Sequence, residues 1–167
     1  MNISQIPAQA SVLIDANILV YHLAGVSPDC TAFLRRVALR ELDSYVTTTI
    51  IAEALHRRMV GEAIAKRIVS PSQALKKLKA NPEIISRLAG YIADIEALLK
   101  LPLRIIEVTA PDLAASHALR RAHGLFVNDS INLACAQRAG VSDVVTNDGD
   151  FTRVPFINIW KPTDLPG

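Results

Sequence analysis

Five acidic residues of this chain occupy positions where the sequence passes from an apolar segment into a turn or a helix. Carboxylates that are held close together raise one another's pKa, and a bound divalent cation relieves their repulsion. Oxygen ligands suit Mg²⁺ or Mn²⁺, and such an ion polarises a phosphoryl oxygen and converts water into a nucleophile. If the five acids meet, they indicate metal-assisted hydrolysis of a phosphodiester. They are Asp15, Glu53, Asp129, Asp148 and Asp150.

Each of these acids also has an ordinary structural explanation. Asp15 could cap the helix that follows it. Glu53 and Asp129 could stabilise the positive end of a helix, and Asp148 lies in Asn147-Asp148-Gly149-Asp150, which resembles a common turn. Both explanations stay open for any one residue, but a joint placement of all five is much harder to produce by accident.

The surrounding pattern predicts an α/β fold with a central, mostly parallel five-stranded sheet flanked by helices. Short apolar runs rich in Val and Ile indicate strands, and they alternate with helical stretches, as in crossover connections. The expected strands are 11–15, 45–48, 103–108, 143–146 and 157–160. The expected helices are 17–24, 28–43, one from 49 onward, 111–123 and 128–139, with a helical insertion at about 57–101. Ser70-Pro71 and Asn81-Pro82 should interrupt that insertion, because the residue before a proline avoids helical backbone angles.

This arrangement brings the acids to one edge of the sheet. Ligands of open parallel sheets bind at the carboxyl ends of the strands. Asp15 ends the first expected strand and Asp148 follows the fourth. Glu53 lies in the helix that leaves the second strand, and Asp129 opens the helix that runs down to the start of the fourth. We therefore expect these carboxylates to share one rim.

Composition narrows the classes of protein. The chain has 167 residues, of which 50% are hydrophobic and 20% charged, which favours one folded domain over residues 1–167 and excludes a disordered chain. Its two cysteines, Cys30 and Cys135, form no disulfide or zinc-finger pattern. No apolar run is long enough to span a membrane, and the N-terminus lacks the pattern of a secretory signal. We therefore expect a cytoplasmic protein with no membrane partner.

The formal net charge is only +2, from 18 basic and 16 acidic residues. If five acids share a metal site, 11 acids remain and the rest of the chain carries a formal charge of +7. A positive body around a metal-filled rim suits a polyanionic substrate. Lys76, Lys77 and Lys79 form a small basic cluster, which is either a solvated helix face or a contact for RNA or a partner.

Three stretches resemble the PIN-domain family, and within it the VapC-type toxins of toxin–antitoxin pairs. Val12-Leu13-Ile14-Asp15-Ala16-Asn17 is similar to the opening strand with its Asp-x-Asn signature, although many members have a hydroxyl residue in place of Ala16. Thr47-Thr48-Thr49-Ile50-Ile51-Ala52-Glu53 is similar to the segment with the second acid. Asn128-Asp129-Ser130-Ile131-Asn132 and Val145-Thr146-Asn147-Asp148-Gly149-Asp150 resemble the third and fourth acid motifs. The likeness spans about 11–163.

The resemblance implies an endoribonuclease that hydrolyses RNA with a Mg²⁺- or Mn²⁺-activated water. It also implies a homodimer that a cognate antitoxin protein inhibits. The catalytic and metal-binding acids would be Asp15, Glu53, Asp129 and Asp148, with Asp150 supporting the site or holding a second ion. Asn17, Thr146 and Asn147 would support these ligands, and Asn132 could assist.

Two other functions stay open. A PIN fold that has lost its activity could serve as a scaffold or RNA-binding subunit. A receiver-like phosphotransfer domain is a remote alternative, because it also has an acid after the first strand and a Thr after the fourth, but here Val108-Thr109 offers no aspartate to accept phosphate. Glu53 and His56 have the Glu-x-x-His spacing of di-iron bundles, which need two such motifs, so we expect His56 at the surface or in a groove.

Overall fold

The computed structural model describes residues 1–165 and places five parallel strands in one sheet, in the order β3-β2-β1-β4-β5. The predicted α/β fold is therefore confirmed, and every strand pair is parallel. Receiver-like folds have the order 2-1-3-4-5, so this sheet excludes that alternative. The strands are β1 (Ser11–Ile14), β2 (Asp43–Thr47), β3 (Leu103–Ile106), β4 (Asp143–Val145) and β5 (Asn158–Trp160).

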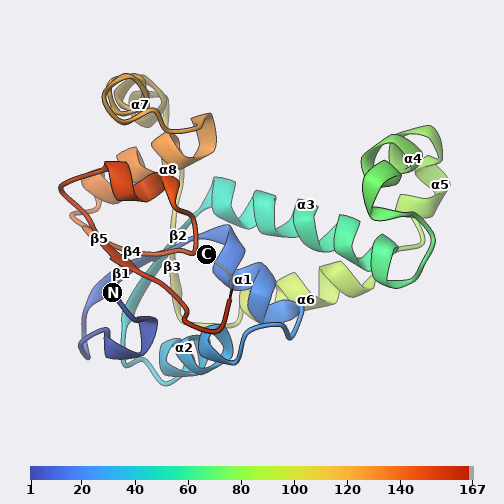
Figure 1. The fold of residues 1–167 in the computed structure, drawn as a ribbon, viewed down its shortest axis with the longest axis horizontal. Helices are drawn as coiled ribbons and strands as arrows, with labels where there is room; N and C mark the ends of the chain where they lie inside the picture. The colour runs from blue at the N-terminus through green and yellow to red at the C-terminus, as the bar shows by residue number, and fades with distance from the viewer. Residues whose placement is uncertain (166–167) are drawn as a thin grey trace.

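Helices cover both faces of the sheet, as a parallel sheet requires. Figure 1 shows α7 (Ala110–His123) and α8 (Val127–Arg138) on one side and α1 (Ala16–Leu23) and α2 (Pro28–Ala38) on the other. The central strands are apolar on both faces for this reason: Val12, Ile14, Val144 and Val145 are fully buried. Burial of these side chains is the main force that holds the helices against the sheet.

The predicted helical insertion forms an arm. Figure 1 shows α3 (Thr48–Ala65) extending away from the sheet, α4 (Ala74–Ala80) and α5 (Pro82–Ile85) at its far end, and α6 (Gly90–Leu98) returning beside it. A short 3-10 helix begins at Pro71 and α5 begins at Pro82, so both predicted interruptions are confirmed. Lys76, Lys77 and Lys79 are exposed on α4.

Glu62 ties the arm together. This side chain is only 7% exposed, and its carboxylate accepts hydrogen bonds from the backbone N–H groups of Gly90 and Tyr91, at the start of α6. Lys66 donates to the same carboxylate at 2.5 Å. Burial alone would raise the pKa of Glu62, but the Lys66 ammonium and these N–H groups outweigh it and lower the pKa to about 2. The far end of α3 and the start of α6 are therefore joined by a buried charge.

The largest boundary error of the sequence interpretation concerns the second expected helix. It was expected to run to residue 43, but α2 ends at Ala38 and β2 already begins at Asp43. Arg40 adopts a φ of 59°, in the left-handed region, which ends the helix and turns the chain toward the sheet. The remaining boundaries differ by one or two residues. Among residues 1–165, no helix is long and apolar enough to cross a membrane.

Candidate active site

Asp15 connects the first strand to the first helix. It directly follows β1 and is the N-cap of α1, where its Oδ1 accepts a hydrogen bond from the backbone N–H of Ala16 at 2.6 Å. Its Oδ2 accepts from Asn17 Nδ2 and from Thr146 Oγ1, both at 2.6 Å. The ordinary capping role is therefore real, but it uses only one carboxylate oxygen. The other is oriented by side chains from two separate segments.

Thr146 joins that segment to the end of β4. Its hydroxyl donates to Asp15 and accepts from Asn17 Nδ2 at 3.1 Å and from the backbone N–H of Asp148 at 2.9 Å. Thr146 is fully buried and Asn17 is 8% exposed, so water does not compete for these bonds. The backbone N–H of Asn147 donates to Asn17 Oδ1 at 3.3 Å. The three predicted supporting residues thus hold the Asp148 turn against Asp15.

Asn132 joins the two helices that carry Glu53 and Asp129. It is 3% exposed, and its Oδ1 accepts hydrogen bonds from Thr47 Oγ1 and Thr49 Oγ1, both at 2.6 Å. Thr47 is the N-cap of α3, which carries Glu53 two turns later, and Asn132 lies one turn after Asp129 on α8. The start of α3 is therefore fastened to the first turns of α8. Through these two hydroxyl groups, Asn132 helps to fix the position of Glu53 relative to Asp129.

Glu53, Asp129 and Asp148 line one pocket of about 450 Å³. This pocket lies at the carboxyl edge of the sheet, beside the point between β1 and β4 where the strand order reverses. Ligands of open α/β sheets bind at such a point. Three of the five predicted acids therefore line the same pocket, whereas Asp15 and Asp150 do not line it. The pocket is completed by residues that the sequence interpretation did not single out: Phe126, Val127 and Asn128.

The acids share one electrostatic field. Burial, together with the charges of Asp15, Asp148, Glu53 and Asp150, raises the pKa of Asp129 to about 6. The pKa of Asp15 is also raised to about 6, mainly by burial and in part by the charges of Glu53 and Asp148, although the hydrogen bonds from Thr146 and Ala16 lower it. Two carboxylates with pKa values near 6 indicate a site where negative charge is crowded and poorly hydrated.

That crowding fits a divalent cation in its chemistry. The donors are carboxylate oxygens, which hard ions such as Mg²⁺ and Mn²⁺ prefer. Within residues 1–165, however, no group of three or more His, Cys, Asp or Glu side chains has the spacing to hold a metal ion. Glu53 and Asp150 lie against cations of the chain instead: Arg57 Nη1 is 3.5 Å from Glu53, and Arg153 Nη2 is 3.0 Å from Asp150. A cation at the centre would need the carboxylates to move together.

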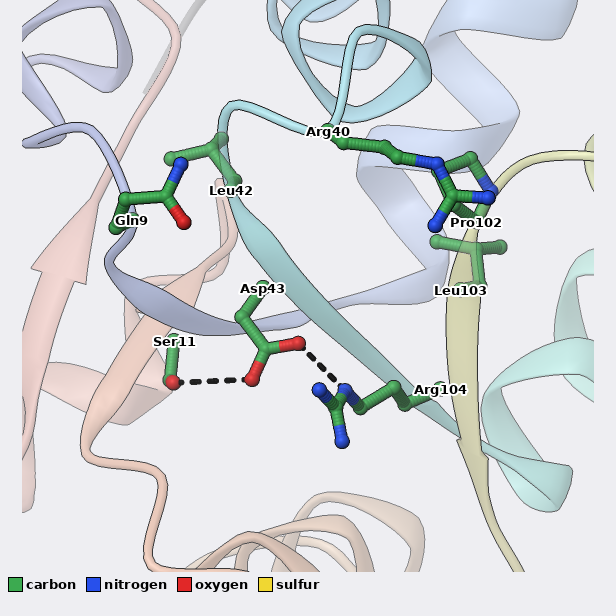
Figure 2. Close-up of a pocket in the computed structure, with 8 residues that line it drawn as sticks. All are labelled: Gln9, Ser11, Arg40, Leu42, Asp43, Pro102, Leu103 and Arg104. Carbon is green, nitrogen blue, oxygen red and sulfur yellow. Dashed lines mark hydrogen bonds and ion pairs between the residues drawn. The ribbon is translucent and has the colours of Figure 1, made fainter.

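The other predicted features lie outside this pocket. His56 is exposed on α3, as expected, and no second Glu-x-x-His motif accompanies it. A larger polar pocket of about 590 Å³ lies at the opposite edge, where β1, β2 and β3 begin. Figure 2 shows the Asp43 carboxylate there, bonded to Ser11 and paired with Arg104. Tyr45 also donates to Asp43 at 2.8 Å. Asp43 is thus a partnered carboxylate, whereas Asp129 forms no ion pair with any of residues 1–165.

Comparison with known proteins agrees with this geometry. The chain is 23% identical over 150 residues to Ribonuclease VapC2 of Methanocaldococcus jannaschii. The aligned residues cover 89% of this chain and 91% of that protein. It also resembles two solved structures in fold. One is VapBC2 of Rickettsia felis bound to a promoter DNA fragment, with a TM-score of 0.59, 16% identity and coverage of 91% and 98% of the two chains.

The second is VapC20 of Mycobacterium tuberculosis, described as a toxin that cleaves the sarcin-ricin loop. Its TM-score is 0.59 at 13% identity, over 87% of this chain and 96% of that one. The sequence model of the PIN-domain family matches residues 12–157, a range that starts at the second residue of β1 and ends just before β5. That range contains all five acids and the whole sheet apart from its last short strand and Ser11. The chain therefore belongs to the PIN-domain family.

Proposed function

We propose that this protein is a Mg²⁺- or Mn²⁺-dependent endoribonuclease and the toxin of a toxin–antitoxin pair. One observation carries the proposal: acids from three separate segments of a PIN-domain chain line one pocket, and Thr146 links Asp15 of a fourth segment to the turn of Asp148. Burial and the charges of neighbouring carboxylates raise the pKa values of Asp15 and Asp129 to about 6. Likeness to a protein named as a ribonuclease supports the choice of RNA.

Each residue has a role in this proposal. Asp15, Glu53, Asp129 and Asp148 would hold the ion, and Asp150 would support it from the rim. When bound, the ion would supply charge stabilisation for the phosphoryl group and acidify a water. Thr146 and Asn17 fix the orientation of the Asp15 carboxylate, which reduces the reorganisation that binding requires.

The test is cleavage of a mixed RNA preparation by the purified protein with Mn²⁺. We expect cleavage that EDTA abolishes and that Asp15→Asn lowers at least ~100-fold, since ligand substitutions weaken both binding and chemistry. Glu83→Gln is the matched control, because Glu83 is an exposed acid on α5, far from the pocket. Cleavage that survives both EDTA and Asp15→Asn would refute a metal nuclease.

The second candidate is a PIN-fold scaffold or RNA-binding subunit without activity. One observation favours it: no group of three or more acids, His or Cys among residues 1–165 has metal-binding spacing. Titration calorimetry with Mn²⁺ separates the two functions. Binding that disappears in Asp129→Asn supports the nuclease, whereas no binding and no cleavage of any RNA support the scaffold.

The toxin assignment includes two partners, a second copy of the chain and an antitoxin. Its support is the likeness in fold to toxin–antitoxin complexes, one from Rickettsia felis and another from Klebsiella pneumoniae. We expect induced expression to arrest growth, and co-expression of the neighbouring upstream gene to restore it. Unimpaired growth with folded, nuclease-active protein would count against a toxin. Light scattering of the purified protein tests the homodimer.

A further inference from the structure

Phe126 stands at the rim of the acidic pocket. It is 74% exposed, more than any other large hydrophobic side chain among residues 1–165, and Val127 beside it is 56% exposed. Both residues line the pocket together with Glu53, Asp129 and Asp148. A folded protein normally hides a phenyl ring of this size, so its position beside the acids calls for a reason.

The ring also occupies a position that favours other residues. Phe126 is the N-cap of α8, where Ser, Thr, Asp or Asn would accept a hydrogen bond from the first turn of the helix. It provides no such bond, whereas Ser27 caps α2 and Thr47 caps α3 through their hydroxyl groups. Phe126 therefore does not serve the stability of its own helix. Local rules of this kind are broken most often where a residue serves function.

The exposure of the ring does not come from a loose loop. Leu125 is 5% exposed and packs with Leu133 and Val154. Gly124 ends α7 with a φ of 63°, and its carbonyl accepts a hydrogen bond from Arg153 Nη2 at 3.1 Å. The backbone on one side of Phe126 is thus fixed to the core, and α8 begins on the other side. The ring is a pre-positioned surface.

We propose that Phe126 is the stacking platform for an unpaired nucleobase next to the phosphodiester that is cut, a proposal that rests on the ribonuclease function proposed above. An aromatic ring contributes about 5- to 150-fold in affinity for each base that stacks on it, without any charge. The acids of the pocket repel a polyanion, so an uncharged contact at the rim suits this site. Recognition of single-stranded RNA commonly uses stacking of splayed bases.

Substitution by asparagine separates stacking from structure. Phe126→Asn removes the ring but supplies a good N-cap, so we expect the Tm to stay unchanged or to rise while KM for a cleavable RNA oligonucleotide increases about 5- to 150-fold, with little change in kcat. Phe126→Trp should restore KM. Leu39→Asn is the control, because Leu39 is 63% exposed at the end of α2 and does not line the acidic pocket.

The second part of the experiment changes the RNA instead of the protein. The same oligonucleotide with an abasic nucleotide beside the cut site should bind the wild type and Phe126→Asn equally, measured by fluorescence anisotropy in EDTA, where the proposed nuclease leaves the RNA intact. Equal affinity of both proteins for the intact oligonucleotide would overturn the proposal. A fall in the Tm of Phe126→Asn would do the same, because the ring would then be structural.

A third result would indicate that the Phe126 ring contacts a protein partner instead of RNA. If Phe126→Asn keeps its RNA affinity but binds the product of the neighbouring upstream gene more weakly, the RNA platform is wrong. Failure of the ribonuclease proposal is recognised separately, since the anisotropy measurement needs no cleavage. Wild type that cuts no RNA yet binds it in a manner that depends on Phe126 would contradict the enzyme and support the platform.

Discussion

Asp129 offers the sharpest test of the idea that the pocket is built for a cation. Its pKa is raised from 3.8 to about 6 by burial and by four neighbouring carboxylates. The folded state therefore holds a proton on Asp129 more tightly than the unfolded state does. Above pH 6 the residue is ionised in both states, and the folded state carries the full penalty. Below about pH 4 the penalty is absent.

The penalty can be estimated from the shift. One pKa unit corresponds to about 1.4 kcal/mol, so a rise of about two units amounts to ~3 kcal/mol, and solvent around the open pocket reduces this to about 1–3 kcal/mol. Asp129→Asn removes the charge but keeps the shape. We expect the metal-free variant to be more stable than the wild type by that amount at pH 7.5, which for a chain of this size is a rise of about 2–4 °C in Tm per kcal/mol.

The assay is urea unfolding in EDTA at pH 7.5 and at pH 4, followed by thermal unfolding with Mn²⁺. The gain in stability should vanish at pH 4, and Mn²⁺ should stabilise the wild type only. Asp112→Asn is a control of opposite sign, because Arg138 beside Asp112 holds the pKa of that carboxyl well below its usual range. That variant should lose stability at pH 7.5. An Asp129→Asn protein that is no more stable than the wild type at pH 7.5 would refute the crowding argument.

Three further predictions follow from other residues. Thr146→Val removes a hydrogen bond that lowers the pKa of Asp15, so the pH at which half of the Mn²⁺ affinity is lost should rise. Calorimetry with Mn²⁺ from pH 5 to 8 measures this midpoint, and an unchanged midpoint would contradict the prediction. Glu62→Gln should cost about 1–3 kcal/mol in urea unfolding at pH 7 and speed amide exchange at the start of α6, with the loss disappearing as pH falls from about 4.5 to 2. If the lysines of α4 contact RNA, replacing them with serine should reduce the slope of log affinity against log salt by up to about 2, and an unchanged slope would identify a solvated face. They are Lys76, Lys77 and Lys79.

Several parts of the fold were predictable because they depend on short stretches of chain. Alternating apolar strands and helices gave the parallel sheet, and the prolines at 71 and 82 gave the breaks in the insertion. The end of α2 was missed, because it depends on the left-handed backbone of Arg40, and arginine carries no local signal for that conformation. The strand order was also beyond the sequence, since it depends on which strands pair across long separations.

The candidate site divides in the same way. Chain order alone placed Asp15 after one strand and Asp148 after another, and the rule for parallel sheets brought them to one edge. Phe126 could not be identified in this way, because the sequence does not show whether a phenylalanine side chain is exposed or buried. Its exposure follows from the packing of Leu125 into the core, which turns the next residue outward.

The sequence by itself determined the chemistry that is available: five carboxylates near the ends of the expected strands and helices, and the order of the elements that carry them. Only the tertiary structure decided which carboxylates are partnered. Asp43 is matched by Arg104 and Asp112 by Arg138, whereas Asp129 meets mainly other acids. The physical reason is that a carboxylate's charge is balanced or crowded by groups within a few ångströms, and strand order and helix packing choose those groups.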